Sequence, residues 1–340
     1  MAQFTIKDLA RELDVSASTV SRALRGHPDI SDATKKRVAE AAERHNYHPN
    51  QLAQSLQKRR SNTIGVIVPE IGHDFFSTAI SGIEEVAYEN GYTIMVCQSG
   101  ETLRREIINT QALVANRVAG LLIAISSQTT NSEHLSGAMR QGVPLVQFDR
   151  VVESLPTSKV VVDDFRAAYI ATSHLAEAGY RRIGHMAGQD GIALNRNRFE
   201  GYRAALHDHD LDYDARFHLH GGYAEEDGRR GAARYLAMAE RPDAVLAIND
   251  PVAVGLYVEF KRAGLRIPDD IALVGFSDTP AAALIEPALT TVFQPAFAMG
   301  RAAASLLLKQ FDADDATMVP ETVVLDTELR VRGSSARRRG

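Results

Sequence analysis

Short β-branched runs alternate with helical patterns from residue 63 to residue 276, and this alternation restricts the fold more than any other feature. Strand-like runs lie at 63–68, 92–97, 120–125, 144–148 and 160–163, and helical patterns such as 77–90 and 101–116 separate them. A second series has strands at 182–187, 217–220, 244–248 and 271–276, with helices at 196–207, 225–239 and 252–263. Such βαβ series form parallel sheets. The pattern predicts an α/β fold of two doubly wound parallel-sheet lobes around a cleft.

The charge distribution separates a small head from this body. The 340 residues have a net charge of −5, but residues 1–60 contain 11 Lys and Arg against 7 Asp and Glu. The head therefore carries +4 and the rest of the chain carries −9. A basic end on an acidic body is typical of a protein that holds a polyanion at one end. A chance clustering of solvated surface charges is the alternative.

The single cysteine, Cys97, excludes an intrachain disulfide and indicates a reducing compartment. The N-terminal residues MAQFTIKDLARELD contain no apolar signal core, and no stretch approaches 18 uninterrupted apolar residues. We therefore expect a cytoplasmic protein without a membrane span.

The head carries the signals of three short helices. Thr5 and Asp8 form a T-x-x-D capping box, Ser16 caps a second helix, and Ser31 caps a third that runs to about His45. Helix, tight turn and helix together predict a small all-α helix-turn-helix DNA-binding domain. A three-helix bundle with an ordinary polar surface is the alternative.

The second helix is predicted to present short side chains and one long donor. Ala17, Ser18, Ser21 and Arg22 remain outward when the apolar positions face the core. Such a surface fits a major groove, where an arginine reaches guanine O6 and N7. Arg22 is therefore the candidate base reader.

Residues 4–69, with FTIKDLARELDVSASTVSRALRG, NYHPNQLAQSL and TIGVIVP, resemble the LacI/GalR family of bacterial transcription regulators. The resemblance continues to about residue 333 through GYRRIGHMAG, RFEGYRAAL, DAVLAINDPVAVGLY, GLRIPDDIALVGF and PALTTVFQP. It implies a headpiece at 1–48, a hinge helix and linker at 49–62, and a two-lobe effector-binding and dimerisation domain at 63–333. It also implies three crossings between the lobes, near 162–164, 290–294 and 322–327. Residues 334–340 are expected to form a disordered tail.

The hinge segment has its own physical logic. Asn50 can cap a helix in which Ala53 is small enough for two copies to approach each other. A helix this short is marginal alone, so we expect it to form on a second copy and on DNA. The resemblance implies that Leu56 is a wedge inserted into the minor groove. The predicted DNA-binding residues are Thr5, Ser16, Ala17, Ser18, Thr19, Ser21, Arg22, Tyr47, Asn50, Ala53, Leu56 and Gln57.

Two head residues depart from the family pattern. Asp14 stands where relatives usually have Gly between the first two helices, and the position is expected to need a left-handed backbone, which Asp tolerates. Gln57 stands where many relatives have Lys or Ala, which leaves the base preference at the operator centre open.

Polar groups follow the predicted strands of the body, where ligands of parallel sheets bind. The predicted effector-binding residues are Phe76, Asp149, Arg198, Asn249, Ser277 and Asp278. A guanidinium with carboxylates and an amide suits a polyhydroxylated ligand, and Phe76 can stack on a sugar or purine. Helix capping by the Asn and Asp residues, and interlobe packing by Phe76, are the alternatives. Many relatives have Asp in place of Ser277, where the carboxylate accepts hydrogen bonds from the ligand. Either Asp278 takes that role here, or the ligand is different. One option is an anionic ligand held near Arg196 and Arg198.

Catalytic signatures are missing from the sequence, which has no G-x-G-x-x-G, P-loop or G-x-S-x-G motif. His207, His209, His218 and His220 are interpreted as surface histidines rather than a metal site, and no cofactor is expected. The predicted function is a homodimeric transcription regulator, most simply a repressor, that binds a pseudo-palindromic operator and a small carbohydrate-type effector. A purine or other non-sugar co-repressor, a solute-binding receptor and an α/β enzyme are the alternatives.

Overall fold

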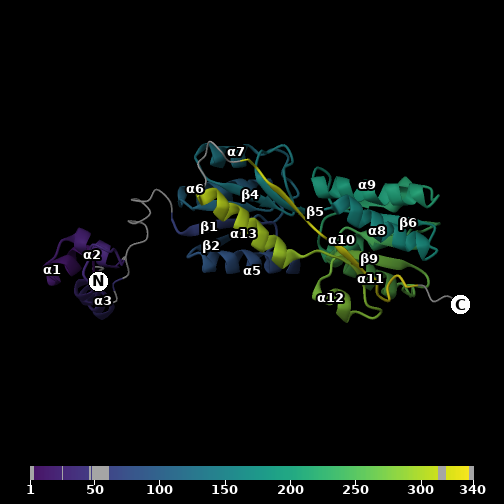
Figure 1. Ribbon diagram of the computed structural model, residues 1–340. Coiled ribbons are helices and arrows are strands. Elements are labelled where there is room, and N and C mark those ends of the chain that lie inside the picture. Colours follow the sequence, from purple (N-terminus) through teal and green to yellow (C-terminus); the bar gives the residue numbers. More distant parts are fainter. Residues whose placement is uncertain (1–3, 25, 46, 48–60, 313–318, 337–340) are drawn as a thin grey trace. The chain divides into compact units, whose positions relative to one another are not determined.

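The computed structural model describes residues 4–24, 26–45, 47, 61–312 and 319–336 (Figure 1). The chain divides into two compact units, with the boundary in the sequence between Ser61 and Asn62. The first unit is the helical head and the second is the two-lobe body. Among the described residues, no helix is long and apolar enough to cross a membrane.

The head contains the three predicted helices, α1 (Ile6–Glu12), α2 (Ala17–Leu24) and α3 (Asp32–Arg44). Each begins at its predicted cap. The Thr5 hydroxyl donates to Asp8 Oδ2 at 2.6 Å, and the hydroxyls of Ser16 and Ser31 accept backbone N–H groups three residues ahead. Buried Leu9, Val20 and Val38 join the three helices. The caps fix where each helix starts, and the apolar faces hold the helices together.

The turn between α1 and α2 is left-handed at Asp14, whose φ is 51°. This confirms the conformation expected at that position. The guanidinium of Arg37 on α3 donates to the carbonyl of Leu13 at 3.2 Å. The third helix thereby holds the turn on which the angle between α1 and α2 depends.

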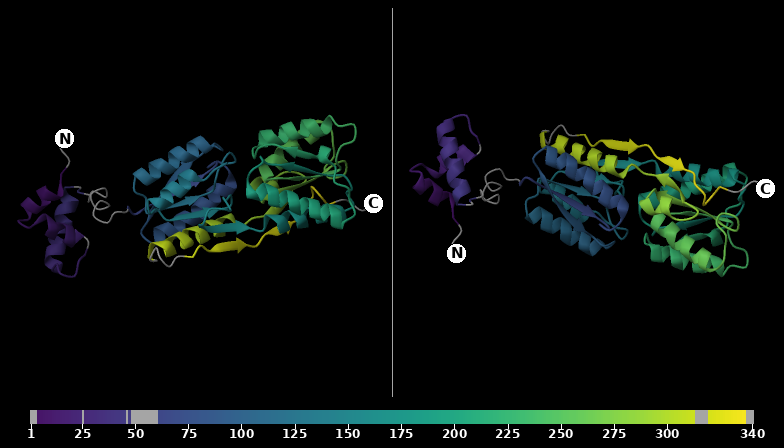
Figure 2. Two further views of the ribbon diagram at one scale, coloured as in Figure 1. Left: turned by 90° about the horizontal axis from the view of Figure 1, so that it is seen from above. Right: turned by 90° about the horizontal axis from the view of Figure 1, so that it is seen from below.

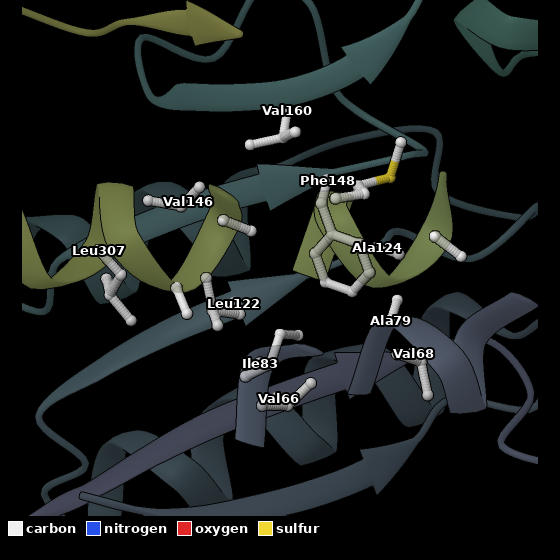
Figure 3. Packing of buried hydrophobic residues seen from close by; sticks show 14 of the residues in the cluster. Val66, Val68, Ala79, Ile83, Leu122, Ala124, Val146, Phe148, Val160 and Leu307 are labelled. Carbon is white, nitrogen blue, oxygen red and sulfur yellow. The ribbon is translucent and has the colours of Figure 1, made fainter. Parts of the chain in front are cut away.

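The first lobe contains a six-stranded, fully parallel sheet with the order β11-β5-β4-β3-β1-β2. Its strands are β1 (Thr63–Val68), β2 (Thr93–Gln98), β3 (Gly120–Ile123), β4 (Leu145–Phe148), β5 (Ser158–Val162) and β11 (Thr322–Leu325). The helices α5 (Asp74–Glu89) and α13 (Ala296–Asp312) pack on one face, with α6 (Leu103–Ala115) and α7 (Glu133–Arg140) on the other. Figure 3 shows side chains such as Val66, Phe148 and Leu307 filling the layer between the sheet and its helices.

The second lobe contains a six-stranded sheet with the order β12-β10-β9-β8-β6-β7, in which only β12 runs antiparallel to its neighbour. Its strands are β6 (Ile183–Ala187), β7 (His218–His220), β8 (Ala244–Ala247), β9 (Ala272–Ser277), β10 (Thr290–Phe293) and β12 (Glu328–Arg330). One face carries α8 (Asp164–Glu177) and α9 (Ala193–Asp208), and the other carries α10 (Glu225–Leu236) and α11 (Asp250–Arg262). The short helices η1 (Ala215–Phe217) and α12 (Pro280–Leu284) complete it. The predicted α/β class is confirmed.

The chain crosses between the lobes three times. It leaves the first sheet after β5, returns between β10 and α13, and leaves again between β11 and β12. Both views of Figure 2 show the last crossing as the yellow segment that runs from one lobe to the other. The crossings fall at or next to the three predicted positions. They place residues at the carboxyl ends of both sheets opposite one another.

The C-terminal residues correct one expectation. Ser334 and Ser335 were expected in a disordered tail, but both are fully buried. The Ser334 hydroxyl donates to the Leu273 carbonyl at 2.6 Å and accepts the Thr290 N–H at 2.8 Å. The Ser335 hydroxyl lies 2.7 Å from His174 Nε2. Small hydroxyl side chains satisfy strand and helix groups here, so the ordered body extends past residue 333.

Candidate functional site

The head presents Arg22 to solvent from the last turn of α2. Its guanidinium makes no hydrogen bond or ion pair with any residue in the described part of the chain. Ser18 is also exposed, and its hydroxyl lies 2.7 Å from that of Ser16. Thr19 bonds to the same Ser16 hydroxyl at 2.8 Å. Ser21 is half-buried on the same helix. An exposed arginine beside short hydroxyl side chains fits the geometry of major-groove readout.

Several predicted DNA-binding residues have structural partners inside the head. Ala17 was expected to face outward, but it is half-buried and packs against the head core, as Tyr47 does. Thr5 engages Asp8 in the capping box. These contacts give the three residues structural roles in the head. Asn50, Ala53, Leu56, Gln57 and the predicted hinge helix lie outside the described residues.

The body holds a small central cavity between its lobes, with a volume of about 30 Å³. That is room for about one water molecule. Five of the six predicted effector residues line it: Phe76, Asp149, Arg198, Asn249 and Ser277. They come from α5 and β4 in the first lobe and from α9, β8 and β9 in the second. The topology thus brings together residues that lie up to 201 positions apart.

Arg198 is buried in the wall of the cavity on the first half of α9. Its Nε donates to Asp164 Oδ1 at 2.8 Å, and one Nη group donates to the Ile248 carbonyl. The guanidinium carbon also lies 3.6 Å from the centroid of the Phe276 ring. These contacts fix the plane of the guanidinium, so that it reaches the cavity with a defined orientation.

Arg150 is a second buried arginine at the cavity, and the sequence reasoning missed it. Its Nη1 donates to both carboxylate oxygens of Glu101, at 2.7 and 2.9 Å. Its guanidinium lies 4.0 Å from the Tyr223 ring centroid and 5.5 Å from that of Phe76. Because Tyr223 belongs to the second lobe, Arg150 joins the lobes through a cation–π contact.

Asp149 points its carboxylate into this environment from the end of β4. Burial raises its pKa to about 6, although the positive charges of Arg150 and Arg198 act in the opposite direction. The carboxylate makes no hydrogen bond with the described residues, and its nearest charged partner is Arg150 Nε at 3.9 Å. Because no described residue donates a hydrogen bond to this carboxylate, Asp149 can accept one from a ligand at the cavity.

Asn249 serves two purposes at the start of α11. Its Oδ1 caps the helix by accepting the Val252 N–H at 2.9 Å, which is the structural alternative considered from the sequence. Its Nδ2 donates to the Tyr223 carbonyl at 2.9 Å and lies 3.5 Å from His73 Nε2 in the first lobe. Burial, with the nearby charge of Arg150, lowers the pKa of His73 to about 4, so the imidazole is neutral.

Ser277 and Asp278 have different surroundings despite their adjacency. The Ser277 hydroxyl donates to Gln294 Oε1 at 3.0 Å at the cavity. Asp278 does not line the cavity, because Arg330 and Arg332 pair with its carboxylate. The option that Asp278 substitutes for the acceptor missing at Ser277 is therefore not supported by its position. Gln294 lines the cavity beside Ser277, and the sequence reasoning placed it only at a crossing between the lobes.

Several residues that follow or end strands at the cleft side of the sheets have a left-handed backbone. Glu101, Asp149, Ser277 and Asp278 all have φ values in the left-handed region, from 56° to 116°. Such conformations cost about 1–3 kcal/mol each in non-glycine residues and persist where the surroundings enforce them. Their grouping at strand ends supports a functional assignment for this edge of the two sheets.

A larger cavity of about 490 Å³ adjoins the central one and lies within the size range of small-molecule sites. The two cavities share His73, Phe76, Arg150 and Tyr223. On the lobe surface, Arg196 pairs with Glu153 of the other lobe at 2.7 Å and lines neither cavity. We call the cavity of about 30 Å³ the inner cavity and the cavity of about 490 Å³ the outer cavity.

The four histidines that are close in the sequence, at positions 207, 209, 218 and 220, line neither cavity. His218 packs against Phe199 with ring centroids 4.3 Å apart, and burial lowers its pKa to about 4. His207 is exposed, and His220 lies 3.3 Å from Asp190. In the parts of the chain that the structure describes, no three His, Cys, Asp or Glu residues are grouped so as to hold a metal ion.

A helix-turn-helix head with an exposed arginine, in one chain with two lobes around a polar cleft, defines a ligand-responsive DNA-binding protein. Residues 5–50 match the family model for bacterial regulatory proteins of the lacI family, and residues 172–335 match the periplasmic binding protein-like domain. The chain is 31% identical over 331 residues to the HTH-type transcriptional repressor CytR of Escherichia coli strain K12, covering 97% of this chain and 96% of that protein. The chain belongs to the lacI family.

Other relatives extend this comparison. The HTH-type transcriptional repressor PurR of Photobacterium profundum is 32% identical over 306 residues, covering 90% of this chain and 91% of that protein. The transcriptional regulator CelR–cellobiose complex has a TM-score of 0.74 at 28% identity, covering 97% and 99% of the two chains. The lac repressor dimer bound to operator and the anti-inducer ONPF has a TM-score of 0.86 at 24% identity, covering 99% and 100%, which shows a shared fold. The relatives named here are transcription regulators, not enzymes.

Proposed function

We propose that this protein is a homodimeric transcription repressor that acts in the cytoplasm and binds a pseudo-palindromic operator. A small carbohydrate-type effector, bound between the lobes, sets its affinity for that operator. The observation that carries the proposal is the cleft, where Asp149 and Arg150 of one lobe meet Arg198 and Asn249 of the other. A ligand that bridges them changes how the lobes pack.

The donor set of the cleft suits hydroxyl groups. Asp149 offers acceptors, Arg198 offers donors, and Phe76 and Tyr223 offer ring faces. Each hydroxyl of a sugar both donates and accepts a hydrogen bond, so a sugar can satisfy this mixed set. Two structural neighbours hold sugars: the CelR complex contains cellobiose, and a LacI family regulator from Enterococcus faecium, with 30% identity and a TM-score of 0.72 over 81% of this chain and 98% of that chain, contains ribose.

A purine or other non-sugar co-repressor is the second candidate. The rings of Phe76 and Tyr223 favour it, because both reach the cleft and a purine ring stacks on aromatic faces. Either effector would act through the same physical device, a difference in affinity between two states of the dimer. An inducer prefers the state with low DNA affinity, and a co-repressor prefers the other.

The role of the head is tested through Arg22. The change Arg22→Ala should weaken binding to the preferred duplex by about 1–3 kcal/mol, because the bidentate contact to guanine is lost. Binding to an unrelated duplex should change much less. The measurement is fluorescence anisotropy with a duplex selected from a random pool. Lys36→Ala removes the same charge from the exposed surface of α3 and serves as the control, which should affect both duplexes alike. Unchanged affinity and footprint for Arg22→Ala would exclude Arg22 as a base reader.

A further inference from the structure

The charges of the inner cavity are already compensated within the protein. Arg198 pairs with Asp164 at 2.8 Å, and Arg150 pairs with Glu101 at 2.7 Å. Asp149 adds a third carboxylate, which has no hydrogen bond to the described residues and lies 3.9 Å from Arg150. Asp164 and Glu101 lie outside the lining of the inner cavity, but with Asp149 they give three carboxylates for the two guanidiniums, so these groups together carry no excess positive charge.

The outer cavity is more acidic than the inner one. Arg150 is the one cationic side chain among the described residues that line it, and it is shared with the inner cavity. The carboxylates that line the outer cavity are those of Glu70, Asp74, Glu101, Glu225 and Asp227. Asp227 pairs with Arg230 and Glu225 pairs with Arg229, but both arginines lie outside the lining. The carboxylate of Asp74, in the first turn of α5, has no hydrogen bond or ion pair with another described residue.

Two buried polar atoms of the cleft that lack a hydrogen-bond partner in the described structure belong to uncharged side chains. Gln294 is 3% exposed, and its Nε2 has no hydrogen-bond partner in the described structure. The Nδ1 of His73 is also buried without a partner, and the low pKa of this side chain keeps it neutral. A buried donor without a partner costs free energy, so a bound ligand that accepts from Gln294 is stabilised. A hydroxyl oxygen meets this need without bringing charge.

We infer that the effector bears no negative charge: it is an uncharged or amino-substituted polyhydroxylated molecule, held by Asp149, Arg198 and Gln294 and extending toward the carboxylates of the outer cavity. The inference rests on the proposed effector site and names its ligand class. A phosphate or carboxylate group would lose its hydration and face carboxylates of the same sign. An ammonium group would face carboxylates of opposite sign.

Arg196 was the other reason to consider an anionic effector, because it neighbours Arg198 in sequence. Its guanidinium pairs instead with Glu153 at 2.7 Å, both side chains are more than half exposed, and the pair lies outside the two cavities. The arginine pair seen in the sequence therefore does not form a single anion site.

The inference is tested by binding to matched compounds. The full chain is titrated calorimetrically with glucose, glucosamine and glucose 6-phosphate, with ribose and ribose 5-phosphate, with cellobiose and cellobionate, and with adenosine and its monophosphate. We expect at least one uncharged or amino compound to bind. Its anionic counterpart should bind at least 10-fold more weakly at low ionic strength, with the difference reduced by salt.

A double variant links the discrimination to the outer cavity. Asp74→Asn with Glu225→Gln should reduce the preference for the uncharged compound over its anionic counterpart at least 3-fold, while the uncharged compound still binds. Glu89→Gln removes a carboxylate from the exposed end of α5, away from both cavities, and should leave the preference unchanged.

Two outcomes overturn the inference. In the first, an anionic compound binds as tightly as its uncharged parent or more tightly. In the second, no compound of the panel binds. Operator binding by the same preparation is measured in parallel with each compound. Sequence-specific DNA binding that persists in either case leaves the regulator function in place, whereas its loss would contradict the proposed function itself.

Discussion

Asp14 adopts a left-handed conformation, with a φ of 51°, in the turn that sets α2 against α1. This conformation costs an ordinary L residue about 1–2 kcal/mol, and glycine avoids the cost. Asp14→Gly should therefore stabilise α1 and α2 by about 0.5–1 kcal/mol, after allowance for the greater freedom of glycine in the unfolded chain. Amide hydrogen exchange of these helices in the full chain measures the change. Asp14→Ala should have the opposite effect, and equal effects of the two variants would contradict the account.

Asp149 should make stability depend on pH. Its pKa of about 6 in the folded protein exceeds the ordinary value of 3.8, so the folded state binds the proton more tightly than the unfolded chain does. Its contribution to stability is complete below about pH 4 and is lost as the pH rises through 6. Asp149→Asn removes this loss. The variant should gain about 3 kcal/mol relative to the wild type at pH 7.5 and about half of that at pH 5.

Urea unfolding of the ligand-free protein at the two pH values measures this difference. The informative quantity is how the difference in unfolding free energy between variant and wild type changes with pH. Any stability that the asparagine side chain itself costs is the same at both pH values and cancels. A difference between the two proteins that stays the same at both pH values would show that Asp149 is not the titrating group.

The roles of some single residues could be predicted from the sequence, and those of others could not. Thr5, Ser16 and Ser31 could be predicted as caps because capping depends on neighbours within three or four positions. Arg150 could not, because an arginine is normally exposed and its partner Glu101 lies 49 residues away. Gln294 could not be predicted either, since its importance comes from an amide nitrogen, at a crossing between the lobes, that has no hydrogen-bond partner among the described residues.

The helices α5 and α13 cross where each has a glycine. A Cβ at Gly82 would collide with the carbonyl oxygen of Phe297, and one at Gly300 would collide with that of Ala79. Gly82→Ala should therefore destabilise the body by about 2–3 kcal/mol, because the helices must move apart. Thermal unfolding measures the effect, expected at about 2–4 °C per kcal/mol for a domain of this size.

Gly137 provides the matched control on another helix, α7. A Cβ there would meet only the end of the Arg140 side chain, at 3.7 Å. Gly137→Ala should stabilise the protein by about 0.5–1 kcal/mol through helix propensity alone. If Gly82→Ala were as harmless as this control, the close crossing of α5 and α13 would be refuted.

At the level of elements, periodicity located the strands of both series within about two residues, because buried parallel strands are short β-branched runs. The expectation of a disordered tail was wrong for Ser334 and Ser335. Their burial depends on hydrogen bonds to strand residues Leu273 and Thr290 and to His174 on α8. No local pattern reports such contacts.

The whole molecule is organised by its three crossings. They bring the carboxyl ends of two separate sheets together, so that a ligand touches both lobes at once. The lobes already meet through Arg150 and Tyr223 and through Glu153 and Arg196. The family resemblance predicted the crossings, but the balance of charge across the cleft emerged only once the partners of each arginine were known.

The central claim is that two copies of this chain bind DNA as a dimer and recognise the two halves of a pseudo-palindromic sequence. Selection of duplexes by the full chain from a random pool tests it most directly, followed by affinity measurements with selected and scrambled duplexes at 50 and 200 mM salt. The account predicts a pseudo-palindromic consensus, bound at least ~10³-fold more tightly than the scrambled duplex, with affinities that fall steeply as salt rises. A pool without a consensus, or equal affinity for selected and scrambled duplexes, would contradict it.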